Sequence, residues 1–388
     1  MNLNKLYALS KSNRLNFKYA EIILQIIIVI YLLISIYIFL TTTNTLGKEL
    51  YLNYTSGYIR RGLVGQITFL LVKNFEIPLQ YIDFFISIVI KTCTLTFLFL
   101  LVIRKKINLL LIFSPPLLLA GFQYSGGNAA IFGKLDFLLL LCFLTQIILY
   151  KKNKNYLLYL SFSTIGIFIH ELFYFISLMP SLLLFKNDKK KLFIYLIFST
   201  SLLLIQWLFK GDVSQINAIN EEWKKIGIYT QDTERLKKLV STSSINLWWN
   251  INKTFIQKIG FILNNLLVLF FLIIMFIKKE NNKKRIENFV KILLLQNIVF
   301  FTLSMIANDY GRWYFLLFTT IIIYFYLYEE NKNSDNKILK LNKTSEKLYH
   351  LRYILYFFIG IPIANWSFHS FKHSLPLIKM VDTFKEFL

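Results

Sequence analysis

Cysteine is scarce in this chain, and its scarcity excludes two kinds of architecture. The two cysteines, Cys93 and Cys142, each lie alone in an apolar segment, with no second cysteine or histidine at metal-ligand spacing. A disulfide framework needs several paired cysteines, and a structural zinc site needs clustered ligands. The sequence therefore predicts no disulfide framework and no metal site. Both cysteines are expected to be buried small hydrophobic residues.

Several familiar catalytic motifs are absent as well. The chain has no GxxxxGK[ST] phosphate-binding loop, and the His170–Glu171 pair is not part of an HExxH zinc-peptidase motif. No internal repeat is visible, which weakens an inverted-repeat transporter interpretation. Because the phosphate-binding and zinc-peptidase motifs are absent, we expect no cofactor.

Apolar residues, in contrast, are abundant. They make up 56% of the 388 positions. They form repeated runs of about 20 residues, the length that crosses a bilayer. The first run, 20–40, has no small-residue cleavage site after it, so we expect it to remain as a membrane helix. The sequence predicts an all-α fold, a polytopic transmembrane helix bundle, with residues 1–388 forming one integral membrane domain.

The apolar runs predict about ten or eleven membrane segments. The stretch 156–185 is apolar and has basic clusters at both ends, so we expect a hairpin of two short helices that turns near His170 and Glu171. The other expected segments are 20–40, 79–103, 107–122, 136–150, 192–210, 261–278, 292–308, 313–328 and 353–369.

The chain carries a formal net charge of +23, which is a signature of some nucleic-acid-binding proteins. Here the basic residues lie in short clusters between apolar runs, as expected of topology determinants that remain in the cytoplasm. We therefore expect no nucleic-acid partner and a cytoplasmic N-terminus. The clusters at 104–106, 151–154, 189–191 and 278–291 then share the cytoplasmic side, as does a polar linker at 329–350.

The opposite, outer side receives two notable loops, 41–75 and 211–260. The first contains GYIRRGLVGQ, in which Arg60 and Arg61 precede a short apolar stretch expected to lie as an interfacial helix. A basic pair on the outer side runs against the usual charge bias, and arginine suits bidentate binding of a lipid diphosphate. Alternatively, both arginines bind anionic lipid headgroups or cap the helix.

Three further patches contain polar residues near the ends of expected helices. In QYSGGNAAIFGKLD, Lys134 and Asp136 are candidate substrate-binding residues, although Asp136 could instead cap a helix. His170 and Glu171 are ionisable groups at membrane depth, which favours a functional role. Glu171 is a candidate general base and His170 a candidate hydrogen-bond donor.

The third patch is the expected outer turn ANDYGRWYF. Here Asp309 is a second candidate base and Arg312 a candidate substrate-binding residue, unless the two side chains simply pair. In the long loop 211–260, Arg235 is the basic residue most suited to substrate binding.

The order of the motifs GYIRRGLVGQ, GKLDFLLL, IHELFYF with Pro180, and NDYGRW resembles that of multi-pass membrane proteins of bacterial surface-polysaccharide assembly. The chain looks similar to O-antigen or capsule polymerases of the Wzy kind and, more loosely, to GT-C-type glycosyltransferases. Enzymes of the second group usually carry paired acidic residues in the first outer loop, whereas this chain has only Glu49 there. The base therefore stays open between Glu171 and Asp309.

The resemblance implies a glycosyltransferase in the bacterial inner membrane that joins glycan units carried on polyprenyl diphosphate. The outer-loop arginines that match in kind are Arg60, Arg61, Arg235 and Arg312. Membrane lipids and other membrane proteins of polysaccharide assembly are the implied partners. Two alternatives stay open: a transporter or flippase of a lipid-linked glycan, and a non-catalytic membrane scaffold. A flippase needs a polar path, for which the chain offers Asp83, Lys91, Gln146, Gln206, Gln296 and Asn297.

Overall fold

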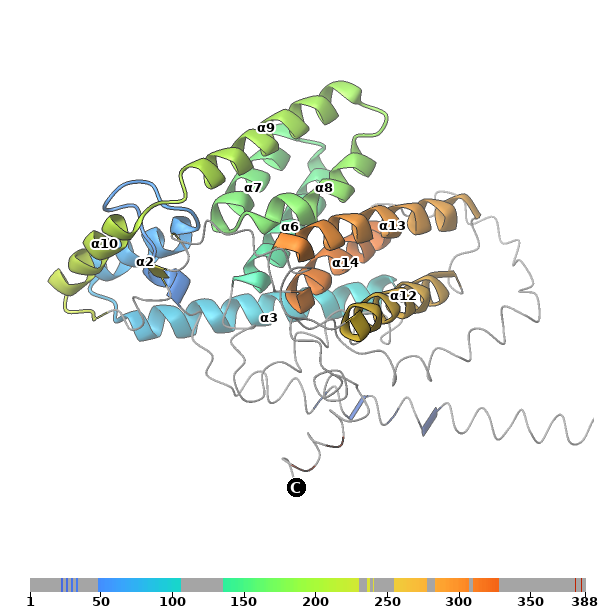
Figure 1. Cartoon of the computed structure of the whole chain (residues 1–388), viewed down its shortest axis with the longest axis horizontal. Coiled ribbons are helices and arrows are strands. Elements are labelled where there is room, and N and C mark those ends of the chain that lie inside the picture. The colour runs from blue at the N-terminus through green and yellow to red at the C-terminus, as the bar shows by residue number, and fades with distance from the viewer. Residues whose placement is uncertain are drawn as a thin grey trace, which may run out of the picture.

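The computed structural model describes residues 48–105, 135–229, 255–277, 283–306 and 310–327, with isolated helical positions within 22–33, 236–240 and 381–385. These residues form ten α-helices and one short 3-10 helix, and the described part of the chain contains no strand (Figure 1). The predicted all-α class is confirmed. The expected segments 107–122 and 353–369, most of 20–40 and the linker 329–350 lie outside the described residues.

The bounds of most described helices match the apolar runs of the sequence. The elements are η1 (Lys48–Tyr51), α2 (Gly62–Phe75), α3 (Leu79–Lys105), α6 (Asp136–Asn153), α7 (Tyr156–Ile169), α8 (Leu172–Leu184), α9 (Lys189–Leu208), α10 (Val213–Lys225), α12 (Phe255–Ile277), α13 (Lys283–Ile306) and α14 (Tyr310–Leu327).

Helices α7 and α8 form the predicted short hairpin, and its turn consists of His170 and Glu171. The side chain of Asn155 caps the start of α7, because its Oδ1 accepts the Leu158 N–H. Close to the turn, a Cβ on Gly166 would lie 2.4 Å from the Phe173 ring. Only glycine therefore permits this close approach of α7 to α8.

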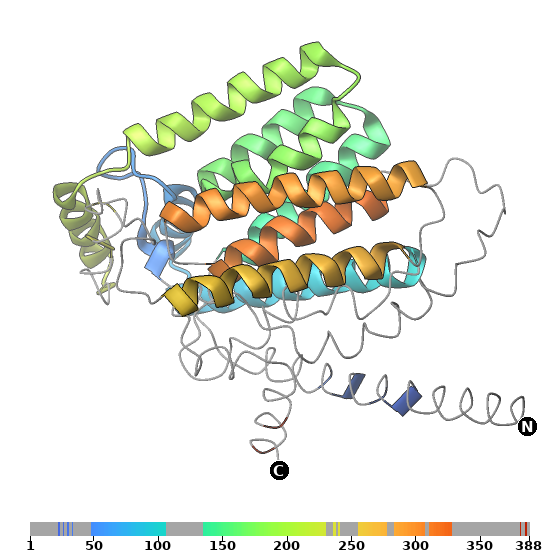
Figure 2. The ribbon, with the colours of Figure 1, turned by 45° about the vertical axis from the view of Figure 1, so that its right-hand side comes forward.

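Most of the helices form one bundle. In both views α9 runs along one edge and α3 and α12 along the opposite edge, with α6, α7, α8, α13 and α14 between them (Figures 1 and 2). Helix α14 lies in the middle, in contact with α6, α8 and α13. Helices α2 and α10 lie at one end of the bundle (Figure 2).

Buried hydrogen bonds join the helices in the interior. Gln146 Nε2 on α6 donates to the Tyr159 carbonyl on α7 at 3.0 Å. The Tyr159 hydroxyl lies 2.7 Å from that of Ser181 on α8. The Ser177 hydroxyl on α8 lies 2.8 Å from that of Tyr195 on α9. These polar contacts join α6, α7, α8 and α9 within a largely apolar core.

The sides of the bundle, by contrast, expose large apolar side chains. Trp207 on α9 is 64% exposed, and similar side chains project from α3, α12 and α13. Soluble monomers rarely expose so continuous an apolar surface. The exposed apolar residues include Phe84, Phe85, Phe193, Ile197, Leu263, Leu266 and Ile298.

Two of the described helices are long and apolar enough to cross a membrane, Lys189–Leu208 and Lys284–Leu303. Because the core helix of a soluble protein can have the same length and composition, the number of membrane crossings stays a prediction. Several shorter apolar helices accompany these two: Gly62–Phe75, Leu79–Ile90, Tyr156–Ile169, Leu172–Leu184, Ile262–Phe276 and Trp313–Leu327.

Some expectations about bounds and burial were wrong. Helix α12 begins at Phe255, inside the expected loop 211–260. Helix α13 begins at Lys283, inside the expected basic loop, and Arg285 on its first turns donates Nη2 to the Phe325 carbonyl at 2.6 Å. That bond satisfies a carbonyl in the last turn of α14, so the N-terminal extension of α13 caps the end of α14. Helix α14 begins at Tyr310, so part of the expected outer turn is helical. Cys142 is buried as expected, but Cys93 is exposed on α3.

Three of the basic clusters meet at one end of the bundle, which we call the basic end. Lys151 Nζ donates to the Leu327 carbonyl at 2.7 Å, close to the Arg285 contact with α14. The Tyr156 hydroxyl donates to the Lys191 carbonyl at 2.6 Å. The clusters near 151, 191 and 285 therefore lie together, at the end opposite to the His170–Glu171 turn.

Candidate functional site

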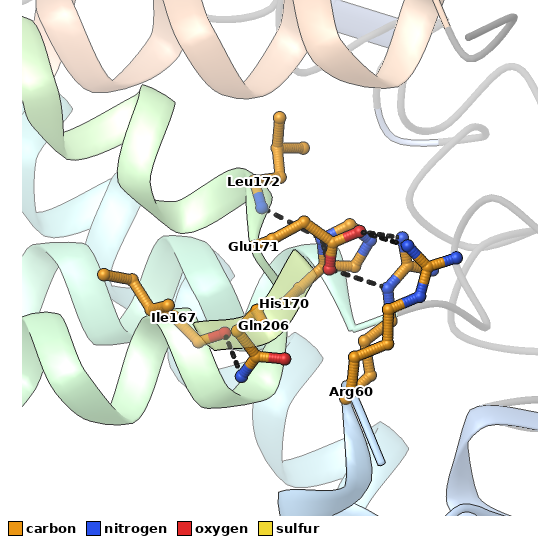
Figure 3. A network of polar contacts seen from close by, with 7 residues as sticks. Arg60, Ile167, His170, Glu171, Leu172 and Gln206 are labelled. Carbon is orange, nitrogen blue, oxygen red and sulfur yellow. Dashed lines mark hydrogen bonds and ion pairs between the residues drawn. The ribbon is translucent and has the colours of Figure 1, made fainter. Parts of the chain in front are cut away.

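Two segments that are 110 residues apart in the chain meet at the end of the bundle opposite to the basic end. Arg61 Nε donates to Glu171 Oε2 at 2.9 Å, and its Nη2 donates to Oε1 of the same carboxylate. Arg60 Nη1 lies 3.9 Å from Glu171 Oε1 (Figure 3). We call Arg60, Arg61, His170 and Glu171 the Arg–Glu cluster. The sequence predicted that both pairs act on one substrate at the outer side, but not that Arg61 and Glu171 are in direct contact.

The turn between α7 and α8 positions the acidic half of the cluster. The buried His170 accepts the Leu172 N–H at Nδ1, with a donor–acceptor distance of 3.1 Å. A ring nitrogen that accepts a hydrogen bond carries no proton, so this geometry favours a neutral imidazole with its proton on Nε2. The distance of 3.4 Å from Nδ1 to Glu171 Oε2 is therefore a contact rather than an ion pair.

A neighbouring helix supports this turn. Gln206 Nε2, near the C-terminal end of α9, donates to the Ile167 carbonyl in the last turn of α7 at 3.3 Å (Figure 3). Because the last carbonyls of a helix have no partner within the helix, this bond ties α9 to the end of α7. Gln206 was considered as part of a polar path, and the structure uses it as a helix-to-helix contact instead.

The basic half of the cluster is positioned by the loop that leads into α2. Arg61 is the residue before α2 and has φ 62° and ψ 13°, in the left-handed region. This conformation costs a non-glycine residue about 1 kcal/mol, and such strain is concentrated at functional sites. A Cβ on Gly65 would lie 1.8 Å from the Leu52 carbonyl oxygen, so the preceding loop lies directly on α2. The Tyr54 N–H also donates to Gln66 Oε1 at 2.7 Å.

Helix α10, from the expected loop 211–260, holds the same loop from its other side. The fully buried Trp223 donates Nε1–H to the Tyr51 carbonyl at 2.9 Å, and Gln215 Nε2 donates to the Ser56 carbonyl at 3.3 Å. Asp212 and Gln215 form a capping box at the start of α10. The mixed polar and apolar sequence of 211–260 predicts amphipathic helices, and the D-x-x-Q spacing marks the start of this one, but its contacts with the Arg-bearing loop were not predicted.

Two tyrosines next to the cluster were also missed. The rings of Tyr54 and Tyr58 stack with centroids 5.6 Å apart, and Tyr58 meets the edge of Phe168 on α7. Neither buried hydroxyl has a hydrogen-bond partner among the described residues. The signal in the sequence was the four-residue spacing of Tyr54 and Tyr58, which lie just before Arg60 and Arg61. These rings form an aromatic contact between the Arg-bearing loop and the hairpin.

The charge of Glu171 is set by its neighbours. Burial alone would raise the pKa of this carboxyl, but the charge and hydrogen bonds of Arg61, together with Arg60, outweigh it and hold the pKa well below the usual range. A contribution from His170 would require an imidazolium, which the acceptor role of Nδ1 opposes. The two arginines are therefore the main cause, and Glu171 is ionised at neutral pH.

Of the other candidate residues, the structure describes the positions of Asp136 and Arg312. Asp136 is 1% exposed and is the first residue of α6. Leu135 occupies the N-cap position, and Asp136 lies in the first turn, where its negative charge suits the positive end of the helix dipole. Of the remaining candidates, Arg312 lies in the first turn of α14. The candidates Lys134, Arg235 and Asp309 lie outside the described residues.

Helix directions bring Asp136 and Arg312 to the same end of the bundle as the Arg–Glu cluster. Helix α6 is antiparallel to α7, because only Lys154 and Asn155 link them. Helix α14 is parallel to α6, since Phe315 lies beside Phe137 with ring centroids 6.0 Å apart and the two C-terminal ends meet at Lys151. Among the described residues, no three His, Cys, Asp or Glu side chains lie close enough to hold a metal.

Comparison of the chain with models of protein families, with curated proteins and with solved structures finds no match. The residues and their geometry therefore carry the functional argument.

Replacing Glu171 with glutamine should remove an acid-dependent part of the stability. Because the folded-state pKa of Glu171 lies below its usual value of 4.5, the ion pair stabilises the fold fully above that pH. Its contribution, about 2 kcal/mol, is lost as the pH falls through the lower folded-state pKa. Unfolding of the purified full-length chain by denaturant, measured from neutral pH down to about pH 2, checks this.

The matched control is Glu222→Gln, because Glu222 pairs with Lys225 on the exposed face of α10. That variant should unfold as the wild type does. An unchanged pH profile in Glu171→Gln would show that the ion pair does not stabilise the fold.

Proposed function

We propose that this protein is a polytopic membrane glycosyltransferase of the polymerase type. In this proposal it joins glycan units carried on polyprenyl diphosphate at the outer face of the bacterial inner membrane. The observation that carries the proposal is the Arg–Glu cluster, in which two adjacent guanidinium groups converge on one carboxylate at the end of an apolar-sided bundle.

The distribution of polar and apolar side chains supports a membrane location. Large apolar side chains such as Phe193 and Trp207 face outward, while Gln146, Ser177 and Ser181 form hydrogen bonds inside. Hydrocarbon solvates an apolar exterior, and buried hydroxyl and amide groups join helices within membranes. A soluble helical protein instead presents mostly polar side chains on the outer faces of its helices.

The positions of the basic residues support the proposed orientation. Lys151, Lys191 and Arg285 lie at the basic end, and the positive-inside rule assigns such an end to the cytoplasm. The Arg–Glu cluster lies at the opposite end and therefore faces outward. The positive-inside rule does not account for arginines on this side, whereas binding of an anionic substrate does.

The cluster has the groups that transfer from a diphosphate carrier requires. Guanidinium groups bind phosphate oxygens bidentately and neutralise a leaving diphosphate without a metal. A carboxylate can accept the proton of the attacking hydroxyl. Glu171 is 23% exposed, Arg60 21% and Arg61 14%, so a ligand can reach all three.

Three of the polar residues of a possible flippase path make contacts between helices. Gln146 and Gln206 donate to carbonyls of α7, and Asn297 Oδ1 accepts a bond from Asn265 at 2.8 Å. These three side chains thus join helices, whereas the charged groups gather at the Arg–Glu cluster. We therefore place the proposed chemistry at the outer end of the bundle.

Removing either half of the cluster should abolish long glycan chains. In a deletion strain, plasmids encoding Arg60→Ala, Arg61→Ala, His170→Ala or Glu171→Ala should yield surface glycan of single repeats, because anion binding or proton transfer is lost. Gel profiles of the surface polysaccharide, with immunoblots for protein level, give the readout.

Glu222→Ala, on the exposed face of α10, serves as the matched control and should restore normal chain length. Normal long chains in a well-expressed Arg61→Ala strain would contradict the proposal. A truncated repeat unit would indicate a single-sugar transferase, and a lipid-linked intermediate trapped in the cytoplasm would indicate a flippase.

The two ends of the bundle should lie on opposite sides of the membrane. In a chain with Cys93→Ser and Cys142→Ala, single cysteines at the exposed positions Lys190 and Ala218 report on the two ends. A membrane-impermeant maleimide should label position 218 in intact spheroplasts and position 190 only after lysis. Labelling of both positions in intact spheroplasts would contradict the orientation.

A further inference from the structure

In this structure both arginines of the Arg–Glu cluster engage the carboxylate of Glu171. Glu171 accepts two hydrogen bonds from Arg61 and lies within ion-pair distance of Arg60. A carboxylate held in this way is a poor proton acceptor, because the positive charges stabilise its ionised form. For the same reason, an arginine engaged with Glu171 has fewer donors to offer an incoming phosphate. Neither half can perform its proposed task while the pair is intact.

We infer that Glu171 is a displaceable counter-ion: a diphosphate takes its place on Arg60 and Arg61, and the released carboxylate then becomes the base. The inference rests on the proposed diphosphate-linked substrate. It assigns to one residue both the control of substrate binding and the proton transfer.

The geometry supports movement of Glu171 rather than of the arginines. Arg61 is fixed by its left-handed backbone, by the contact of Gly65 with Leu52, and by the loop contacts of Trp223 and Gln215 on α10. Glu171 lies instead in a two-residue turn with a partly exposed side chain. A rotation of its side chain alone breaks both bonds to Arg61.

A diphosphate is also the stronger ligand for two adjacent guanidinium groups. Each carboxylate offers two acceptor oxygens and one negative charge, whereas a diphosphate offers more oxygens and more charge. The exchange replaces the weaker anion with the stronger one, so neither Arg60 nor Arg61 is left without a counter-ion. The base therefore becomes available only when the substrate is bound.

The chemical step then balances. The acceptor hydroxyl transfers its proton to the Glu171 carboxylate, and its oxygen forms a bond to the anomeric carbon of the donor sugar. The bond from that carbon to the diphosphate oxygen breaks, and the diphosphate leaves with the electron pair. Its charge is neutralised by Arg60 and Arg61, in place of the carboxylate that it displaced.

Binding of inorganic pyrophosphate to the purified full-length chain in detergent micelles tests the exchange. Glu171→Gln keeps the side-chain size but removes the competing charge, so pyrophosphate should bind about tenfold more tightly than to the wild type. Glu171→Asp, whose shorter carboxylate reaches Arg61 less well, should fall between the two. Arg61→Ala should lose binding. Calorimetry gives each Kd, and a thermal melt establishes that each variant is folded.

The control variant Glu222→Gln should bind pyrophosphate as the wild type does. If Glu171 only scaffolds the arginines, both Glu171 variants will bind more weakly than the wild type or equally well, and the inference is overturned. Absence of binding to the wild type and to folded Glu171→Gln also overturns it.

Binding of farnesyl diphosphate distinguishes a lipid-linked diphosphate from free pyrophosphate as the natural ligand. A lipid-linked substrate predicts that farnesyl diphosphate binds more tightly than inorganic pyrophosphate and shows the same gain in Glu171→Gln. Equal or weaker binding would overturn the assignment to a lipid diphosphate. Because these are binding measurements, tighter binding to Glu171→Gln together with normal glycan chains in Arg61→Ala cells would retain the exchange and reject only the polymerase function.

Discussion

The ion pair between Arg61 and Glu171 is the interaction on which the candidate site depends. It joins the loop before α2 to the turn between α7 and α8, two segments 110 residues apart. The pair offsets the strain of the left-handed backbone at Arg61 and keeps Glu171 ionised in partly buried surroundings. Without it, the partly buried carboxylate of Glu171 would lose its two hydrogen bonds from Arg61.

The rest of the structure positions this pair. Trp223 and Gln215 on α10 hold the Arg-bearing loop against α2, and Gln206 on α9 holds the end of α7. Each contact uses a backbone carbonyl that helix geometry leaves unpaired or that lies in an irregular loop. The bundle below contributes polar contacts inside and an apolar surface outside. This arrangement fits a site that stands at the outer surface of a bilayer.

Sequence periodicity predicted the helices well but not their partners. Runs of apolar residues located α3, α6, α9 and the α7–α8 hairpin with its turn at His170, because these depend on local composition. The start of α13 was wrong because a tertiary contact, that of Arg285 with the C-terminal end of α14, accompanies a helix that extends past its apolar residues. The meeting of Arg61 with Glu171 depends on the packing of distant segments, which no single sequence pattern encodes. The Arg60–Arg61 and His170–Glu171 motifs could be recognised in the sequence, but the direct contact between them could not.

A double-mutant cycle on Arg61 and Glu171 tests the central role of their ion pair most directly. The unfolding free energies of Arg61→Ala, Glu171→Ala and the double variant, each compared with the wild type, give the coupling between the two side chains. The account predicts a favourable coupling of about 2 kcal/mol, as expected for charge-assisted hydrogen bonds in a partly buried setting. A coupling near zero would contradict it and would mean that the two segments meet for another reason.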